Sequence, residues 1–161
     1  SYRTKPNTRS IVEVVAGTGA IHVLHQWFKQ RAVLTKVIGI HGVEHIQDDD
    51  AAVDDTVRDI MSSALSIAMF LSYGFTVHLL HGDLQSRAYS CPRLATSTLD
   101  LHAAYTIYEQ GLMQKRGGFS TQPLMTVHHL LTIGLLAVII TADSGAFYAC
   151  MVGLVEGMCW C

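Results

Sequence analysis

The sequence predicts an all-α, multi-pass transmembrane helix bundle that forms one domain over its 161 residues. Half of the residues are hydrophobic and only 15% are charged, whereas about a quarter of the residues in soluble domains are charged. In addition, the 19 residues from Leu124 to Ala142 contain no Asp, Glu, Lys or Arg. As a helix this run would be roughly 28 Å long, which is close to the hydrocarbon thickness of a bilayer.

We expect about four membrane spans, at residues 11–28, 60–80, 124–142 and 145–160. The first is mostly apolar and ends in Trp27 and Phe28, an aromatic pair typical of a membrane interface. The second has small residues at four-residue spacing, which permits close helix packing. The third is the charge-free run, and Pro123 suits its first position. The fourth contains Gly153 and Gly157 at GxxxG spacing, interrupted by Glu156.

Two further segments, at about residues 32–46 and 98–113, are too polar to be spans of their own. The first is expected to be re-entrant or an imperfect span inside a bundle. In the second, Leu101, Tyr105, Tyr108 and Leu112 recur at helical spacing. That pattern predicts an amphipathic helix that either lies at the membrane interface or packs on the bundle.

Charge predicts an orientation and excludes one class of partner. If two spans separate them, the N-terminus and the connection 83–123 lie on the same side, and together they carry most of the Lys and Arg residues. The positive-inside rule then places the N-terminus on the cytosolic side or its equivalent. The net charge of −2 gives no basic footprint for nucleic acid. The four cysteines show no CxxC spacing, which predicts free thiols.

His128 and His129 lie inside the charge-free run and are the first candidates for function. Ionisable residues within a membrane span are costly, so they are interpreted by default as functional. The alternative is that both imidazoles only form hydrogen bonds to neighbouring helices. Thr132 lies one turn from His128 on the same helical face.

Several motifs, in their order along the chain, resemble the TLC-domain family, which includes TRAM and the ceramide synthases. They are NTRS before the first span, SYGF late in the second, MTVHHLLTI in the third, and Glu156 in the next, 27 residues after His129. The resemblance implies a bundle of transmembrane helices around a cavity open to lipid. It also implies that His128 and His129 belong to a centre that transfers an acyl group from acyl-CoA to a sphingoid base. The chain lacks the paired Asp residues that ceramide synthases carry downstream.

Three interpretations of the histidines remain open. In the first, His128 or His129 is a general base or acyl acceptor, with Glu156 orienting one ring. In the second, the histidines ligate a di-iron centre, because eight of the nine occur in close pairs (22 and 25, 41 and 45, 78 and 81, 128 and 129). The HxxHH cluster of the membrane di-iron enzymes is absent. In the third, the chain is a non-catalytic accessory subunit whose polar residues hold helices together.

The sequence therefore favours lipid binding, sensing or handling, which includes acyl transfer, without a metal or a cofactor. The candidate catalytic residues are His128, His129 and Glu156. Candidate lipid-binding or helix-packing residues are Thr132, Gly74, His78, Gly153 and Gly157. We expect membrane lipids as partners, with other membrane subunits as the alternative. The expected location is the endoplasmic reticulum or a related membrane, with an organellar membrane such as the mitochondrial inner membrane as the alternative.

Overall fold

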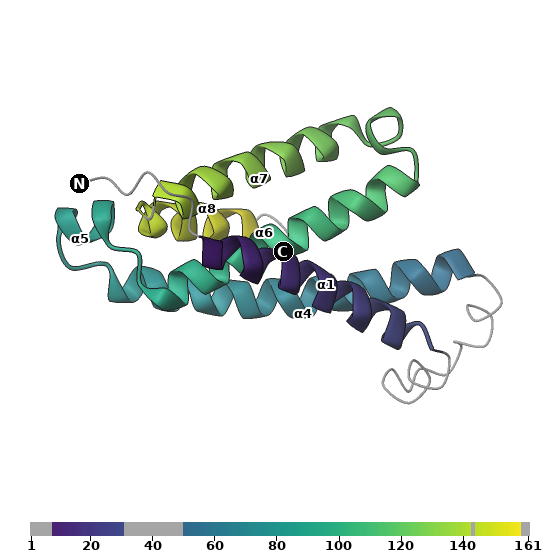
Figure 1. Cartoon of the computed structure of the whole chain (residues 1–161), viewed down its shortest axis with the longest axis horizontal. Helices are drawn as coiled ribbons and strands as arrows, with labels where there is room; N and C mark the ends of the chain where they lie inside the picture. Colours follow the sequence, from purple (N-terminus) through teal and green to yellow (C-terminus); the bar gives the residue numbers. More distant parts are fainter. Residues whose placement is uncertain (1–7, 31–49, 143, 159–161) are drawn as a thin grey trace.

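The computed structural model describes residues 8–30, 50–142 and 144–158, and the surroundings of the side chains of residues 9–30, 53–142 and 144–154. Over these ranges the structure is helical and contains no strand. The helices are α1 (Thr8–Phe28), α4 (Asp50–Leu79), α5 (Leu84–Tyr89), α6 (Arg93–Lys115), the 3₁₀ helix η1 (Gly118–Ser120), α7 (Pro123–Ala142) and α8 (Ala146–Met158) (Figure 1).

Helix α6 is the centre of the bundle and contacts α1, α4, α7 and α8. It runs parallel to α1, because Glu13 contacts Ser97 near the start of both helices and His25 contacts Tyr108 near their ends. It runs antiparallel to α4, since Arg116 at the end of α6 pairs with Asp55 at the start of α4. The bundle therefore has a first end, where α1 and α6 begin, and a second end, where they finish.

The segment 98–113 is part of α6 and packs inside the bundle. This placement also corrects the expected distribution of charge. Arg93 lies at the first end, near Arg9, whereas Arg116 lies at the second end, beside Asp54 and Asp55. The connection 83–123 consequently crosses the length of the bundle, and its basic residues do not lie on one side.

Helix α1 presents its small and polar residues to α6. Ser10 and His25 are buried on this face, and a Cβ atom added to Gly17 would lie 3.0 Å from the Cβ atom of Ala104. The hydroxyl of Thr18 donates to the carbonyl oxygen of Ala104 at 3.3 Å. The absence of a side chain at Gly17 thus lets the two helices approach closely, as small residues do between membrane helices.

The bundle buries polar side chains beside its apolar core, and it exposes many large apolar side chains. Helix α6 buries Thr98, Asp100, Thr106 and Gln110, while the most apolar helix, α7, buries only three side chains. Leu131 and Val138 of α7 are 69% and 66% exposed, and Leu71 of α4 is 66% exposed. Large apolar side chains also face outward along α1. Soluble domains seldom expose contiguous apolar surface on this scale.

Two of the described helices are long and apolar enough to cross a membrane: residues Val53–Leu79 of α4, and α7. The predicted spans at 60–80 and 124–142 fall on these helices. The other two predicted spans, at 11–28 and 145–160, fall on α1 and α8, which do not reach that standard, and α8 has only 13 residues. The predicted segment at 32–46 lies outside the described residues.

Between α4 and α6, the short helix α5 begins with a side-chain cap. The carboxylate of Asp83 accepts a hydrogen bond from the backbone N–H of Ser86 at 2.6 Å. This bond holds the pKa of Asp83 below its usual range, because it stabilises the charged form. The last turn of α5 is hydrogen-bonded to the residue before α8, since the N–H of Gly145 donates to the carbonyl oxygen of Ala88 at 3.1 Å.

Gly153 supports a prediction about how α8 packs on α4. A Cβ atom at this position would collide with the ring of Tyr73, whereas one at Gly134 of α7 would meet nothing within 4 Å. We expect Gly153→Ala to destabilise the bundle by about 1–3 kcal/mol through overpacking. Gly134→Ala should be neutral or stabilising by up to ~1 kcal/mol, because alanine favours the helix.

Thermal unfolding of both variants in a mild detergent measures the difference. Equal stability of the two alanine variants would contradict the close contact between α8 and Tyr73.

Candidate functional site

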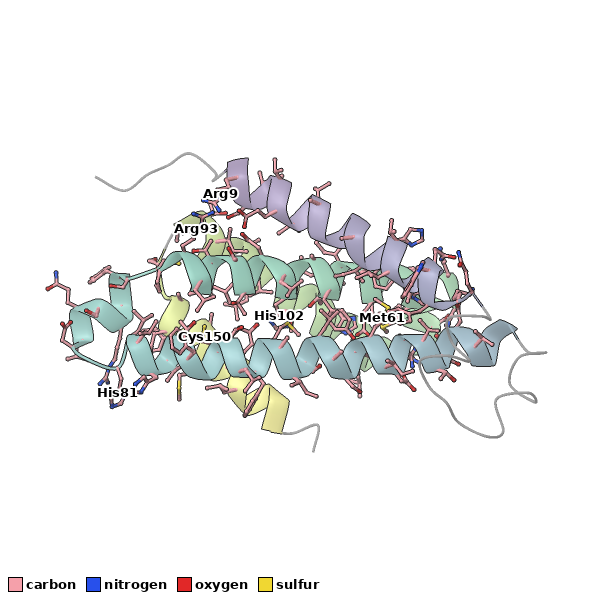
Figure 2. All side chains as sticks on the ribbon, turned by 90° about the horizontal axis from the view of Figure 1, so that it is seen from below. Arg9, Met61, His81, Arg93, His102 and Cys150 are labelled. Atoms are coloured by element: carbon pink, nitrogen blue, oxygen red, sulfur yellow. The ribbon has the colours of Figure 1, made fainter. Side chains whose placement is uncertain are left out.

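Two pairs of polar side chains from three helices lie in the middle of the bundle, and we call the four residues together the core cluster: Tyr73, His102, Glu109 and His129. The hydroxyl of Tyr73 lies 2.6 Å from Nδ1 of His102. One Oε atom of Glu109 lies 3.7 Å from Nε2 of His129. Figure 2 shows His102 between α6 and α4. Tyr73 belongs to α4, His102 and Glu109 to α6, and His129 to α7, so the cluster exists only in the folded bundle.

The two histidines of α7 have different surroundings. The side chain of His129 is buried, with 6% of its surface exposed, and faces Glu109. The side chain of His128 is exposed, and its ring lies 5.9 Å from that of His129. Both imidazoles lie close enough to His102 for their charges to act on it. Of the predicted pair, His129 alone is therefore enclosed with a carboxylate.

Several buried polar atoms around the core cluster form no hydrogen bond within the part of the chain that the structure describes. They include Nδ1 of His129, the hydroxyls of Tyr105 and Thr126, and the side-chain amide of Gln110. Buried polar groups are usually satisfied, so unpaired ones in a native fold call for an explanation such as a functional role. These groups lie on α6 and α7 and give this helix pair a polar interior.

A second polar cluster joins three helices at the second end. His25 is buried and donates from Nε2 to Asp54 at 3.1 Å, since a carboxylate can only accept. The other ring nitrogen then accepts from the hydroxyl of Tyr108. Lys29 lies 2.6 Å and Arg116 3.9 Å from the same carboxylate group. Because every charge here has a partner, this cluster fastens α1 to α4 and α6.

The remaining predicted site residues lie in different places. Thr132 is half-buried on α7, and His78 is exposed on α4. Gly74 has no close neighbour at its Cβ position, whereas Gly153 packs against Tyr73. Glu156 and Gly157 belong to α8, but their surroundings lie outside the described residues. The role predicted for Glu156 therefore stays a prediction, and the carboxylate that the structure places beside His129 is Glu109.

The histidine pairs do not converge on a metal site in the described ranges 8–30, 50–142 and 144–158. No group of three His, Cys, Asp or Glu side chains there could hold a metal ion. His25 lies at the second end, and His81 lies just after the end of α4, in the turn before α5 (Figure 2). The pair at His41 and His45 lies outside the described residues.

The sequence patterns did not point to Tyr73, His102 or Glu109. One signal was available, because His102 and Glu109 are seven residues apart and so share a helical face. Tyr73 is also one of the two aromatic residues of the SYGF motif. What the sequence lacked was the position of α6, since a polar helix becomes a source of site residues only if it is central.

Comparisons with protein-family models, with characterised proteins and with solved structures find no match to this chain.

Tyr73 supports a prediction about the core cluster. Tyr73→Phe removes the hydroxyl that contacts Nδ1 of His102, a residue enclosed between α4 and α6. We expect a loss of about 1–3 kcal/mol in the free energy of unfolding, the usual cost of an unsatisfied buried polar group. Tyr89→Phe is the matched control, because Tyr89 is 66% exposed, and it should change stability by less than about 0.5 kcal/mol.

Chemical unfolding in detergent, followed by far-ultraviolet circular dichroism, compares the two variants. If Tyr73→Phe were as stable as the control, the contact with His102 would contribute nothing to the fold.

Proposed function

We propose that this chain is a multi-pass membrane protein of the TLC type that handles lipid. One observation carries the proposal: the bundle encloses its polar helix, α6, and turns the apolar side chains of α1, α4 and α7 outward. In a bilayer this arrangement buries the apolar surface in hydrocarbon, and the buried polar side chains of α6, such as Thr98, Asp100 and Gln110, are shielded from it. The order of the sequence motifs supports the TLC assignment and, with it, a membrane of the endoplasmic reticulum type.

The core cluster supports acyl transfer as the chemistry of such a protein. A general base must take the proton of the attacking hydroxyl or amine, and a neutral imidazole suits this role near neutral pH. His129 is the histidine we assign to it, because Glu109 lies 3.7 Å from its Nε2 atom and can stabilise the imidazolium that forms. The unpaired hydroxyls and amide nearby could contact the polar end of a substrate.

A second candidate is a non-catalytic accessory subunit of a larger membrane assembly. The observation that favours it is the exposed apolar face of α1, where Val12 and Val15 are 65% and 67% exposed. Such a face suits another membrane helix as well as it suits lipid. Native mass spectrometry of the particle extracted in mild detergent separates the two. A lone chain with retained lipid supports lipid handling, whereas a fixed set of protein partners supports the accessory role.

The proposed membrane location gives a testable prediction. Expressed in cells, the chain should stay in the membrane pellet after extraction with alkaline carbonate and enter solution only with detergent. Leu131→Glu, which would place a charge in the middle of the lipid-facing side of α7, should reduce this retention, because a charged side chain at that depth costs about 2.5–3.5 kcal/mol. Release of the wild-type chain by carbonate alone would exclude the proposal.

The proposed acyl transfer gives a prediction about the core cluster. In an assay with acyl-CoA and a long-chain amine, His129→Ala should lower kcat by about 10²–10⁴-fold, the usual contribution of a general base. Glu109→Gln should lower kcat less, because it removes only the charge that stabilises the imidazolium.

His128→Ala is the matched control and should retain most of the activity, since His128 is exposed. Full turnover by the folded His129→Ala variant would rule out the assignment of the base.

A further inference from the structure

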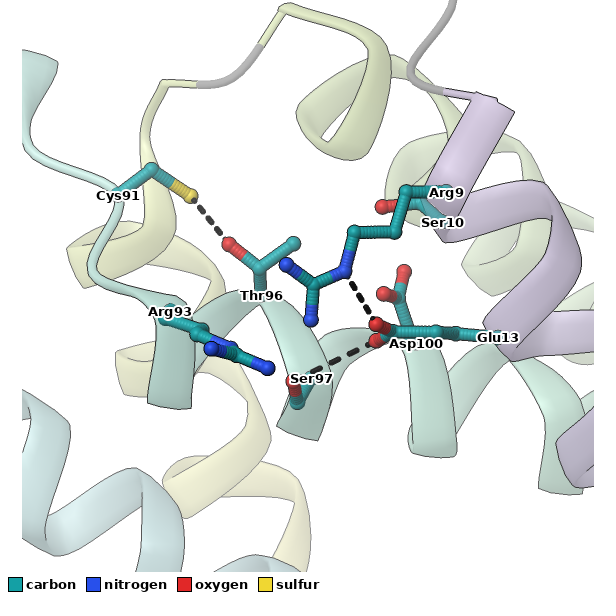
Figure 3. A pocket seen from close by; sticks show the side chains of 8 residues that line it. All are labelled: Arg9, Ser10, Glu13, Cys91, Arg93, Thr96, Ser97 and Asp100. Carbon is teal, nitrogen blue, oxygen red and sulfur yellow. Dashed lines mark hydrogen bonds and ion pairs between the residues drawn. The ribbon is translucent and has the colours of Figure 1, made fainter.

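A pocket of about 190 Å³ opens at the first end of the bundle, between α1 and α6. This volume is below the ~300–1,000 Å³ of pockets for drug-sized ligands, so it suits a small polar group. The pocket lies apart from the core cluster, which is formed by other residues of α6. Its polar lining comes from both helices and is shown in Figure 3: Arg9, Ser10, Glu13, Arg93, Thr96, Ser97 and Asp100.

The carboxyl group of Asp100 is the unusual feature of this pocket. The residue is 2% exposed, yet neither of its carboxylate oxygens forms a hydrogen bond with another part of the described chain. The hydroxyl of Ser10, also 2% exposed, is unpaired as well. A hydroxyl can donate one hydrogen bond, and the hydroxyl of Ser10 lies near enough to Asp100 to act on its carboxyl group. One donor cannot satisfy both carboxylate oxygens, and a buried carboxylate that is short of donors is costly. Asp100 lines a cavity into which a further donor can enter.

The neighbouring charges do not supply that donor. Nε of Arg9 donates to Glu13 at 2.6 Å, and the hydroxyl of Ser97 donates to the same carboxylate at 3.4 Å. Glu13 is thereby satisfied, and Arg9 is committed to it. The group that Asp100 lacks is a small cation with several N–H donors. A primary ammonium has three N–H donors, whereas a quaternary ammonium has none.

An anion-binding element lies at the mouth of the same pocket. Arg93 is exposed and is the first residue of α6, and no carboxylate pairs with it within the described ranges. The residue before it, Pro92, gives α6 no side-chain cap, so the first N–H groups and the positive end of the helix dipole face outward there. An Arg guanidinium beside a free helix N-terminus favours phosphate.

Apolar side chains are exposed beside the pocket at this end of the bundle. Ile11 of α1 is 54% exposed and Leu94 of α6 is 44% exposed, and each adjoins a residue of the pocket in the sequence. If the bundle is embedded in a bilayer, as proposed above, the first end lies at the level of the headgroups. A ligand that enters the pocket from the bilayer then has its acyl chains beside these two residues.

We propose that the pocket between α1 and α6 binds the headgroup of a primary-amine phospholipid, the chemistry of phosphoethanolamine. The ammonium donates to Asp100 inside the pocket, and the phosphate binds Arg93 and the first turn of α6 at its mouth. The choice of a phospholipid over soluble phosphoethanolamine rests on the proposed membrane function. The choice of a primary amine does not, because it follows from Asp100.

The test uses the purified full chain in detergent and four probes: dioctanoyl phosphatidylethanolamine, dioctanoyl phosphatidylcholine, dioctanoyl phosphatidic acid and free phosphoethanolamine. Dissociation constants are measured by isothermal titration calorimetry. We expect the ethanolamine lipid to bind at least about tenfold more tightly than the choline lipid, as lost charge-assisted hydrogen bonds imply. Equal binding of these two lipids, or tighter binding of phosphatidic acid, would overturn the proposal.

Three variants locate the effect. Asp100→Asn keeps the shape of the side chain and should bring the two affinities to within about twofold of each other. Arg93→Gln should weaken both lipids by a similar factor, because it removes a phosphate contact. Lys115→Gln, which removes an exposed charge at the far end of α6, should change neither. An unchanged preference in the folded Asp100→Asn variant would show that the pocket does not select the amine.

Free phosphoethanolamine separates the two sources of this chemistry. Binding of the lipid at least about tenfold more tightly than the free headgroup supports the lipid, whereas equal binding overturns that part of the proposal. Carbonate extraction of the wild-type chain, measured separately, reports on the membrane function. Selectivity for the primary amine in a chain that carbonate releases would therefore exclude the membrane function and leave the chemistry of the pocket standing.

Discussion

The burial of a polar helix determines the rest of this structure. Helix α6 buries hydroxyl, carboxyl and amide side chains beside Ala and Leu residues, and it is covered by α1, α4, α7 and α8. Buried polar groups need partners, so at least one of the covering helices must turn polar or small residues inward. Helix α1 does so with Ser10, Gly17 and His25. Other apolar residues of α1, α4 and α7 are exposed on the outside of the bundle, while those of α4 and α8 also contribute to the core.

The partners of α6 are arranged at three levels along its length. At the first end a pocket contains Asp100 and remains short of donors. In the middle, Tyr73 and His129 contact His102 and Glu109. At the second end, Tyr108 joins the cluster of His25 and Asp54, in which all charges are paired. The polar side chains along α6 are therefore fully paired at the second end and incompletely paired at the first end and in the middle. We assign ligand chemistry to these two incompletely paired levels.

These two levels suit different steps of the proposed lipid handling. A headgroup pocket at the end of the bundle would hold a lipid in a fixed register, while an acid–base pair deeper in the bundle would act on a polar group within the apolar layer. Neither site requires a metal ion. The sites share α6 and no side chain, so each can be altered without direct change to the other.

The sequence by itself determined the all-helical class, the two most apolar spans and the choice of His129 as a candidate functional residue, because hydropathy and helical spacing are local properties. Only the tertiary structure decided that α6 is central and that His129 meets Glu109 while His128 faces outward. It also placed Arg93 and Arg116 at opposite ends of the bundle. These facts depend on which helices pack together, since a polar, weakly amphipathic segment can lie at an interface or at the centre of a bundle. The choice is made by the inward-facing residues of the neighbouring helices, far away in the sequence.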